Sequence, residues 1–335
     1  MRHTLALPLL ALAIAFPAAT ATGQSQDPLR SGPQAKEEQV DQKPKKKREA
    51  IYDESADAKQ QIAAALAKAK KENRRVLIQW GANWCGWCHL LHDLCESDRQ
   101  LKRELLYEYD VVLVDIGRWD KNVDLAEHYG VDFKKHGVPY LTVLDADGSV
   151  LVNQETGSLE DGPKHDPAKV LAFLRENKAP YLTADSVLSE GLVEAKETGK
   201  RVFLHFGAPW CGWCHRLEDW MAREDVARIL GKDFVDVKID TDRTIGGQDL
   251  MKHYTKGQPT GIPWYAVVDP NGEVLVTSNY PTNNIGFPYQ PEEIEAFGQM
   301  LAEGSIRLTD KDIAALKESL AEARQEIERR RSGSR

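Results

Sequence analysis

The sequence predicts an α/β protein that consists of two tandem copies of one domain. The six-residue motif Trp-Cys-Gly-Trp-Cys-His occurs at residues 84–89 and again at residues 210–215. Each copy follows a short apolar run of strand-forming residues and leads into a segment with helical character. Each half also has a Gly-apolar-Pro sequence before a later strand, at residues 137–139 and 261–263. Because each feature recurs roughly 125 residues further on, the repeat is a duplicated whole domain and not a short solenoid unit.

The elements of the first half follow from hydrophobic periodicity and turn residues. Apolar residues at helical spacing predict the helices, apolar runs rich in Val and Leu predict the strands, and an Asp-Ala-Asp-Gly turn predicts a hairpin. The expected elements are a helix over 54–73, a strand over 76–80, a helix over about 85–108, a strand over 111–116, helix and loop over 117–136, paired strands over 141–144 and 150–153, and a helix over 166–177.

The second half repeats this order and adds one helix. The expected elements are a helix over 185–198, strands over 202–206 and 235–240, paired strands over 264–268 and 273–277, and a helix over 291–302. A last helix over 309–331 begins with a capping pattern, Thr309 followed by Asp312, and has apolar residues at helical spacing. We expect this helix to pack on the second domain, and a partner contact is the alternative.

The chain begins with the features of an export signal. Arg2 and His3 precede an apolar run over 5–16 that is short for a membrane span, and residues 19–21 (Ala-Thr-Ala) resemble a cleavage site. We therefore predict a signal peptide over 1–21 and an exported protein, periplasmic or extracellular, with no stable membrane insertion after the signal is removed. An uncleaved membrane anchor is the alternative.

The next segment is polar and ends in a basic run, Lys-Pro-Lys-Lys-Lys-Arg, so residues 22–50 are expected to be a disordered basic linker. Contact of the basic run with anionic lipid or a partner is the alternative. The expected domains are then residues 51–179 and 180–308, followed by the C-terminal helix within 309–335.

Composition narrows the classes of function. The chain has 335 residues and a net charge of −8, with no basic face of the kind that binds nucleic acid, so we expect no nucleic-acid partner. Four of the five cysteines form two Cys-x-x-Cys pairs, which indicates chemistry and not a disulfide framework. The fifth, Cys95, has Met221 as its counterpart in the second half, so we expect a buried apolar position, and a redox-regulatory role is the alternative.

On these motifs the chain resembles the thioredoxin superfamily and, within it, exported bacterial thioredoxin-like proteins with two Trp-Cys-Gly-Trp-Cys sites. The resemblance implies two thioredoxin-like domains, each a mixed central sheet flanked by helices. It also implies that Cys85 and Cys211 are the nucleophiles and that Cys88 and Cys214 resolve the mixed disulfide. Two intervening residues place both sulfurs in the first turn of a helix, where the free N–H groups and the helix dipole favour the thiolate.

The resemblance further implies a substrate-binding surface, made of the aromatic residue before the first cysteine and of a cis-proline with the residue before it. The residues at these places are Trp84, Val138 and Pro139 in the first half, and Trp210, Ile262 and Pro263 in the second. A cis bond costs little only before proline, and it leaves the preceding backbone free to pair with an extended substrate peptide. Ordinary trans-prolines at strand starts are the alternative.

Two departures from the family are informative. The Gly-Trp dipeptide between the cysteines differs from the Gly-Pro of reducing thioredoxins and from the Pro-His of strongly oxidising relatives, so the direction of electron flow stays open.

The family often has a buried acid six residues before the first cysteine, where this chain has Gln79 and His205. We hypothesise that His205, oriented by Asp236 of the neighbouring strand, serves Cys214 as a base, and that the first site lacks this relay. The alternative is that both side chains are only hydrogen-bonded in place.

A histidine follows each second cysteine, at His89 and His215. Because a cation near a helix N-terminus is unfavourable, neutral imidazole is the expected form of both. They either modulate the thiols or are surface histidines without a role.

Three other kinds of protein share parts of this pattern. Cys-x-x-Cys-His is also the attachment signature of c-type haem, so a dihaem cytochrome is an alternative, although the first half has no Met after the signal to serve as a distal ligand. A zinc site shared by the two pairs is weaker, because the pairs belong to separate domains. A non-catalytic binding module with the same fold is the third alternative, and retention of both cysteines in both motifs argues against it.

The sequence therefore predicts a protein disulfide oxidoreductase of the thioredoxin-like kind. Its partners would be protein or peptide thiols and disulfides, and its chemistry would need no bound cofactor and no metal. The upstream redox partner and the coupling between the two sites are left open.

Overall fold

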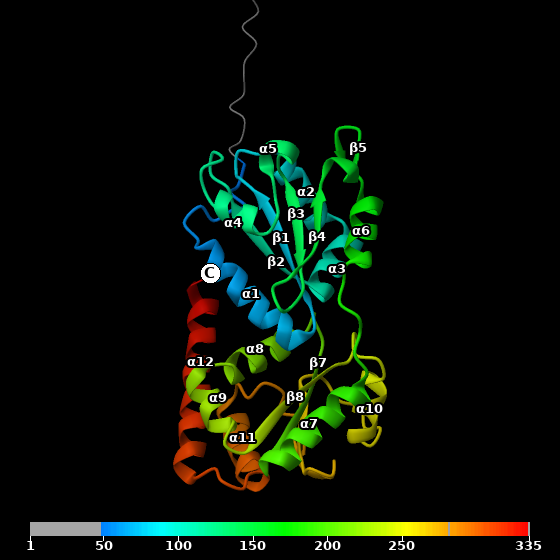
Figure 1. The fold of residues 1–335 in the computed structure, drawn as a ribbon. Coiled ribbons are helices and arrows are strands. Elements are labelled where there is room, and N and C mark those ends of the chain that lie inside the picture. Colours follow the sequence, from blue (N-terminus) through cyan, green and yellow to red (C-terminus); the bar gives the residue numbers. More distant parts are fainter. Residues whose placement is uncertain (1–47, 281, 334–335) are drawn as a thin grey trace, which may run out of the picture. The chain divides into compact units, whose positions relative to one another are not determined.

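The computed structural model describes residues 48–280 and 282–333. The predicted signal peptide over 1–21 lies outside the described residues, and so does the predicted linker except for its last three residues. Two four-stranded mixed sheets with helices on both faces make up the described part of the chain (Figure 1). The predicted α/β class and its repeated organisation are confirmed.

The first sheet is built around its central strand β1, Arg75–Gly81, in the order β2-β1-β3-β4. Strand β2 (Tyr109–Asp115) runs parallel to β1. Strand β3 (Tyr140–Leu144) is antiparallel to β1, and β4 (Val150–Glu155) is antiparallel to β3. The pairing of β1 with β2 sets Leu77 opposite Val111.

Side chains of β1 alternate between two layers of helices. The helices are, on one face, α1 (Ala58–Glu72), α4 (Val123–His128) and α5 (Phe133–His136), and on the other α2 (Gly86–Ser97), α3 (Arg99–Glu108) and α6 (Pro167–Glu176). Ile78 and Trp80 are buried against the first layer, and Leu77 is buried against the second. Strand alternation therefore turns Gln79 and Gly81 toward the second layer, which contains the helix of the cysteine motif.

The second half repeats this arrangement in a sheet with the order β10-β9-β7-β8. Its strands are β7 (Arg201–Gly207), β8 (Phe234–Asp240), β9 (Trp264–Val268) and β10 (Val274–Thr277), with α7 (Ala184–Thr198) and α10 (Gly247–Tyr254) on one face and α8 (Gly212–Met221), α9 (Glu224–Leu230) and α11 (Pro291–Gly304) on the other. Phe203 is buried against the layer of α8, so His205 and Gly207 face the same side.

Two local features differ from the expected elements. The single helix expected over about 85–108 is two helices, because Asp98 ends α2 in an extended conformation and caps α3, accepting the N–H groups of Gln100 and Leu101 at 2.8 and 3.0 Å. A small hairpin of β5 (Glu160–Asp161) and β6 (Lys164–His165) was not expected.

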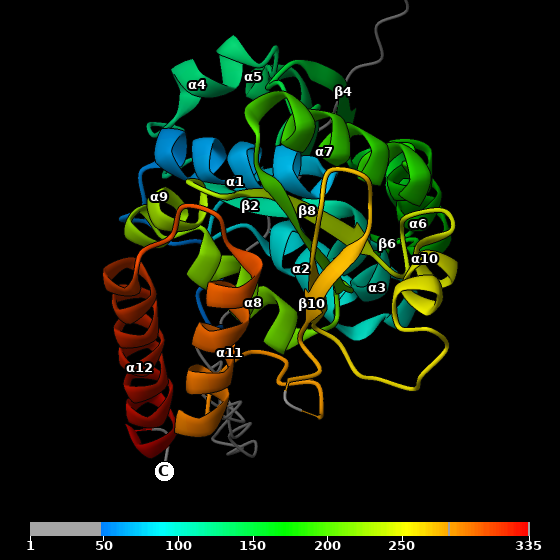
Figure 2. The same cartoon turned by 90° about the horizontal axis from the view of Figure 1, so that it is seen from below.

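The C-terminal helix α12, Asp310–Gly333, packs along α11, and Figure 2 shows the two helices side by side. Leu316, Leu320 and Ile327 of α12 are buried in the core that α8, α9 and α11 share. The indole Nε1 of Trp220 donates to Ser319 Oγ at 3.0 Å. These contacts confirm that the helix packs on the second half, as its apolar spacing predicts.

Candidate active sites

Each cysteine pair lies where the central strand of a sheet passes into the next helix. Cys85 is the N-cap residue of α2, and its Sγ accepts a hydrogen bond from the backbone N–H of Cys88 at 3.1 Å. Cys211 and Cys214 make the same contact at the start of α8, also at 3.1 Å. Each pair forms a disulfide, with Cα–Cα distances of 5.3 and 5.2 Å. Once a pair is reduced, the N–H groups and the dipole of the helix favour a thiolate on the first cysteine.

A cis-proline faces each pair. The Val138–Pro139 and Ile262–Pro263 peptide bonds are both cis. The carbonyl oxygens of Val138 and Ile262 lie 3.6 Å from the Sγ atoms of Cys85 and Cys211. The structure therefore brings together residues that are more than 50 positions apart in sequence. In both halves the backbone that precedes the cis-proline lies directly beside the first sulfur.

The tryptophans before the two motifs are exposed beside the sulfurs. Trp84 is 42% exposed and Trp210 58%. The indole of Trp84 donates to the carbonyl oxygen of Gly117 at 2.6 Å, and that of Trp210 donates to Asp242 Oδ2 at 3.1 Å. Because each indole N–H is held by the loop after the second strand, each ring is fixed as a platform next to the disulfide.

The tryptophans inside the two motifs have different neighbours. Trp87 packs edge-on against His165, with ring centroids 5.2 Å apart. Trp213 instead stacks on Phe287 at 5.9 Å and contacts Tyr289. A cavity of about 240 Å³ lies between Trp213, these two aromatic residues and Pro263. The second site therefore has an aromatic recess directly beside its cis-proline.

The histidines after the motifs tie the helix to the loop before it. His89 Nε2 donates to the carbonyl oxygen of Asn83 at 2.9 Å, and His215 Nε2 donates to that of Pro209 at 2.8 Å. His89 is buried, and His215 is half-buried. Each imidazole thus bonds to a backbone group six residues earlier, which fixes the loop that carries the tryptophan and the first cysteine.

In the first half, Gln79 bonds to a tyrosine that sequence reasoning did not identify. Gln79 Nε2 donates to the hydroxyl of Tyr52 at 2.8 Å, and Tyr52 is only 2% exposed. Burial raises the pKa of Tyr52 well above its ordinary value, so the hydroxyl is neutral. Tyr52 precedes the first helix, and no motif marks it. Its isolated position before an amphipathic helix was the only available signal.

In the second half, His205 is 1% exposed and its Nε2 lies 2.9 Å from Asp236 Oδ1. Lys71 Nζ lies 3.2 Å from the other carboxylate oxygen of Asp236. Burial raises the pKa of Asp236, but the attraction of His205 and Lys71 outweighs it and holds the pKa below the ordinary value. In the pairing of β7 with β8, Asp236 lies opposite Phe203. In the first half Val111 lies opposite Leu77, so Val111 and Asp236 occupy corresponding positions.

Glu218 is a second residue that sequence reasoning did not identify. It lies one helical turn after Cys214, and its Oε2 accepts a hydrogen bond from Lys238 Nζ at 2.8 Å. Its Oε1 is buried and has no hydrogen-bond partner among the described residues. A Cβ added to Gly207 would lie 3.4 Å from this oxygen and 3.5 Å from Cys214 Sγ, so the carboxylate and the sulfur share one side of Gly207. The sequence signal that could have identified Glu218 was its position four residues after Cys214.

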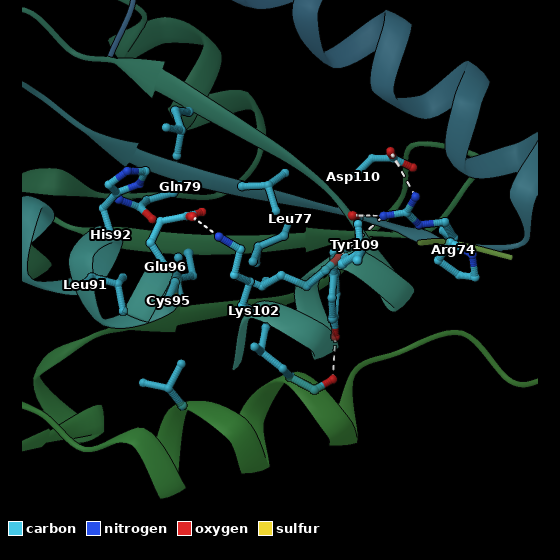
Figure 3. A pocket seen from close by; sticks show the side chains of 18 of the residues that line it. Arg74, Leu77, Gln79, Leu91, His92, Cys95, Glu96, Lys102, Tyr109 and Asp110 are labelled. Atoms are coloured by element: carbon cyan, nitrogen blue, oxygen red, sulfur yellow. Dashed lines mark hydrogen bonds and ion pairs between the residues drawn. The ribbon is translucent and has the colours of Figure 1, made fainter. Parts of the chain in front are cut away.

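Cys95 lines a cavity of about 630 Å³ (Figure 3), whose wall comes mainly from β1, β2, α2, α3 and α6 of the first half and also from Pro209, His215 and Asp219 of the second. The cavity wall is mainly apolar, with Leu77 and Leu91 near Cys95, and neither Cys85 nor Cys88 lines it. Several charged groups at its edge are paired, for example Lys102 Nζ with Glu96 Oε2 at 2.7 Å. Burial raises the pKa of the Cys95 thiol to about 12, with Glu96 and Asp98 adding to the effect. Cys95 thus packs against the apolar core, as its counterpart Met221 indicated, but it is half-buried and not fully buried as expected.

Glu72, His215 and Glu218 each offer one possible metal-ligand atom, all within 4.8 Å of one another. Lys238 Nζ lies 2.8 Å from Glu218 and 4.0 Å from Glu72. Arg74 Nη1 also lies 2.9 Å from Glu72, so each carboxylate has a cationic partner, and the group is better described as an ion-pair cluster than as a metal site. Across residues 48–280 and 282–333, no helix has the length and apolarity needed to cross a bilayer.

A buried dithiol at a helix N-terminus opposite a cis-proline is the arrangement of thioredoxin-fold proteins. The sequence profile described as thioredoxin-like matches residues 57–146 and 183–270, which together make up more than half of the chain. The chain belongs to the thioredoxin-like family, with one matched segment in each half.

Several proteins that are similar to this chain are named disulfide isomerases. The chain is 24% identical over 221 residues to the protein disulfide-isomerase tigA of Aspergillus niger, covering 58% of this chain and 55% of that protein. It is 24% identical over 191 residues to the protein disulfide-isomerase erp38 of Neurospora crassa, covering 57% and 50%. The chain thus spans about half the length of these curated relatives. A solved disulphide isomerase from Xylella fastidiosa Temecula1 is 30% identical, with a TM-score of 0.35, and the match covers 38% of this chain and 96% of that one.

Proposed function

We propose that the protein is a thiol–disulfide oxidoreductase that acts on protein or peptide thiols and disulfides through two Cys-Gly-Trp-Cys sites. One observation carries the proposal. In each half the first cysteine caps a helix, accepts the N–H of the second cysteine at 3.1 Å, and faces the carbonyl that precedes a cis-proline at 3.6 Å. This arrangement favours a thiolate and gives a substrate backbone a place to pair.

In the reducing direction, the thiolate of Cys85 attacks one sulfur of a substrate disulfide. The substrate S–S bond breaks, a mixed disulfide forms, and the second substrate sulfur leaves with the electron pair. The thiolate of Cys88 then attacks the sulfur of Cys85, so the Cys85–Cys88 bond forms and the remaining substrate sulfur leaves. The substrate gains two electrons and the dithiol becomes the disulfide. Cys211 and Cys214 perform the same steps at the second site, and the oxidising direction is the reverse.

Substrate binding is assigned to the surface around the first sulfur. The backbone of Val138 and Ile262 would pair with an extended substrate strand, positioned by Pro139 and Pro263. The exposed rings of Trp84 and Trp210 would cover the substrate next to its cysteine. At the second site, the recess between Trp213, Phe287 and Pro263 would receive a side chain of that peptide.

The groups that modulate the thiols differ between the sites. We assign His205, whose Nε2 lies 2.9 Å from Asp236 Oδ1, as the base that serves Cys214, and Gln79 in its place at the first site cannot accept a proton. His89 and His215 would act by holding the loop in front of each pair, since each donates to a carbonyl of that loop.

The domain organisation that fits this chemistry is one dithiol domain over residues 51–179, a second over 180–308, and the C-terminal helix within 309–335 as part of the second core. The protein would act after export, in the periplasm or outside the cell, where protein disulfides form and persist. The N-terminal sequence features support export.

Reduction of insulin tests the function directly. The protein is supplied with a thiol reductant, and turbidity from the precipitating insulin chain is recorded for four forms: the parent, Cys85→Ser/Cys88→Ser, Cys211→Ser/Cys214→Ser, and the variant with all four substitutions. We expect activity from each single-site form and only the background rate from the last. Equal activity in all four forms, or a strong haem absorption band in the purified protein, would reject the proposal.

A further inference from the structure

The backbone before α1 is attached to the loop that carries the first active site. Asn83 Oδ1 accepts the N–H groups of both Ile51 and Tyr52 at 2.9 Å, and Asn83 Nδ2 donates to the Tyr52 carbonyl at 2.9 Å. Asn83 stands directly before Trp84 and Cys85. Three hydrogen bonds thus fix the position of Tyr52 relative to the first pair, although Tyr52 lies outside the segments that match the family.

The side chain of Tyr52 reaches the buried sulfur. Its ring belongs to the same buried cluster as Cys85 and Cys88. A Cβ added to Gly81 would overlap the Tyr52 hydroxyl and would lie 2.7 Å from Cys88 Sγ. The hydroxyl and the sulfur are therefore neighbours across Gly81, and only glycine leaves room for both. Cys88 itself is fully buried, and the Tyr52 hydroxyl is a polar group beside it.

The hydroxyl of Tyr52 is arranged as a donor toward this sulfur. It accepts a hydrogen bond from Gln79 Nε2 at 2.8 Å, which leaves its own hydrogen free to point elsewhere. Burial, with a contribution from Asp115, raises the pKa of Tyr52, so the hydroxyl keeps its proton at physiological pH. A group of this kind cannot take a proton from a thiol. It can donate a hydrogen bond to a thiolate and stabilise it.

We propose that Tyr52 is a positioning residue of the first site, whose hydroxyl donates a hydrogen bond to the Cys88 thiolate while the mixed disulfide on Cys85 is resolved. The proposal rests on the proposed function. In this step the Cys88 S–H bond breaks, the Cys85–Cys88 bond forms, and the bond between Cys85 and the substrate sulfur breaks. The proton released from Cys88 ends on the departing substrate sulfur. The dithiol is oxidised and the substrate is reduced.

The second site has a different group at the corresponding place. There the space beside Gly207 is shared by Cys214 Sγ and the carboxylate of Glu218, which is paired with Lys238 at 2.8 Å. A carboxylate beside Cys214 disfavours a negative charge on that sulfur, whereas the neutral phenol of Tyr52 can donate a hydrogen bond to the Cys88 thiolate. The two sites are therefore expected to respond to pH in different ways.

The other charged groups near Tyr52 are accounted for. Asp115, the nearest buried acid, lies 3.3 Å from Lys121 Nζ, and Glu54 at the surface accepts from Asn83 Nδ2 at 3.0 Å. These pairs are the same in a Tyr52→Phe variant, because neither includes the hydroxyl. A change caused by that substitution thus reports on the hydroxyl alone.

The experiment isolates the first site in a Cys211→Ser/Cys214→Ser background. A mixed disulfide between Cys85 and a fluorescent peptide is formed, and the rate at which Cys88 releases the peptide is measured between pH 5 and pH 10. In Tyr52→Phe we expect the pH of half-maximal release to rise by about one unit and the rate at pH 7 to fall about tenfold. The attack of Cys85 on the peptide disulfide, measured with Cys88→Ser, is expected to stay unchanged.

Tyr109→Phe is the matched control, because Tyr109 is also buried in the first half and its hydroxyl bonds to the Leu174 carbonyl, away from the sulfurs. We expect its release profile to match the parent. Asn83→Ala, which frees the tyrosine segment without touching the ring, is expected to shift the profile in the same direction as Tyr52→Phe. Superimposable profiles for Tyr52→Phe and the parent would overturn the proposal. A parent that neither forms nor releases the mixed disulfide would instead reject the proposed function itself.

Discussion

His205 Nε2 lies 2.9 Å from Asp236 Oδ1 on the face of the second sheet that carries α8. The first sheet has Gln79 and Val111 in the same two positions, and neither can ionise. A histidine–carboxylate pair thus occupies these two positions in the second sheet and not in the first. The two sites share geometry at the sulfurs and differ in the residues at these strand positions.

His205→Gln is expected to slow thiol–disulfide exchange at the second site by about tenfold or more near pH 7, because Gln cannot accept the proton of Cys214. The measurement is the exchange rate against pH in a Cys85→Ser/Cys88→Ser background, where only the second site reacts. His253→Gln, at an exposed position on α10, is the control. Identical profiles for His205→Gln and the parent background would reject His205 as a base.

Asp236→Asn is expected to lower the free energy of unfolding by about 1 kcal/mol at pH 6, since the partly exposed carboxylate is screened by solvent. The pKa of Asp236 is below its ordinary value in the folded protein, so its stabilising effect is present above the unfolded value of about 4 and is lost as the pH falls below it. Urea unfolding of variant and parent at pH 6 and pH 3 measures this. A difference that stays constant or grows toward pH 3 would contradict the assigned charge.

Glu218→Gln is expected to make the second disulfide easier to reduce. The carboxylate beside Gly207 disfavours a negative charge on Cys214, and its pairing with Lys238 offsets only part of this effect. We expect the reduction potential of the Cys211–Cys214 pair to rise by roughly 10–30 mV, with the first pair unchanged. Equilibration with glutathione measures both potentials, and Glu224→Gln on the exposed side of α9 serves as control. A lower potential in Glu218→Gln would contradict the assignment.

Cys95 is expected to be chemically inert in the folded protein. Its pKa of about 12, set mainly by burial, leaves little thiolate at pH 8. After mild reduction, we expect iodoacetamide to label Cys85 and Cys211 while Cys95 stays unlabelled. In denaturant we expect Cys95 to be labelled as well. Peptide mapping by mass spectrometry distinguishes the three. Labelling of Cys95 as fast as Cys85 in the folded protein would show a reactive thiol.

The features that the sequence predicts well are local or repeated. The Cys-x-x-Cys spacing, the strand before it and the Gly-apolar-Pro sequence occur twice at matching positions, so each copy supports the interpretation of the other. The register that relates Val111 to Asp236 could be predicted because both second strands run parallel to a central strand of the same length. The C-terminal helix was predictable from its cap and its apolar spacing.

The features that sequence reasoning missed depend on contacts between distant segments. Tyr52 reaches Gln79 across 27 positions, and no periodicity marks a single buried tyrosine in a loop. Glu218 looks like an ordinary polar helix residue until Gly207 brings it next to Cys214. The break at Asp98 was missed because the residues on both sides form helices, and only the side-chain bonds to Gln100 and Leu101 show a new N-terminus.

The central claim is that both dithiols exchange with disulfides of other proteins. Trapping measures this most directly: Cys88→Ser and Cys214→Ser variants are incubated with a disulfide-bonded protein, and covalent adducts are resolved on non-reducing gels. We expect each variant to accumulate an adduct that dithiothreitol releases, through Cys85 in the first and Cys211 in the second, and each adduct to disappear when that cysteine is also changed to Ser. No adduct at either cysteine, with both pairs resistant to thiol reductants, would contradict the claim.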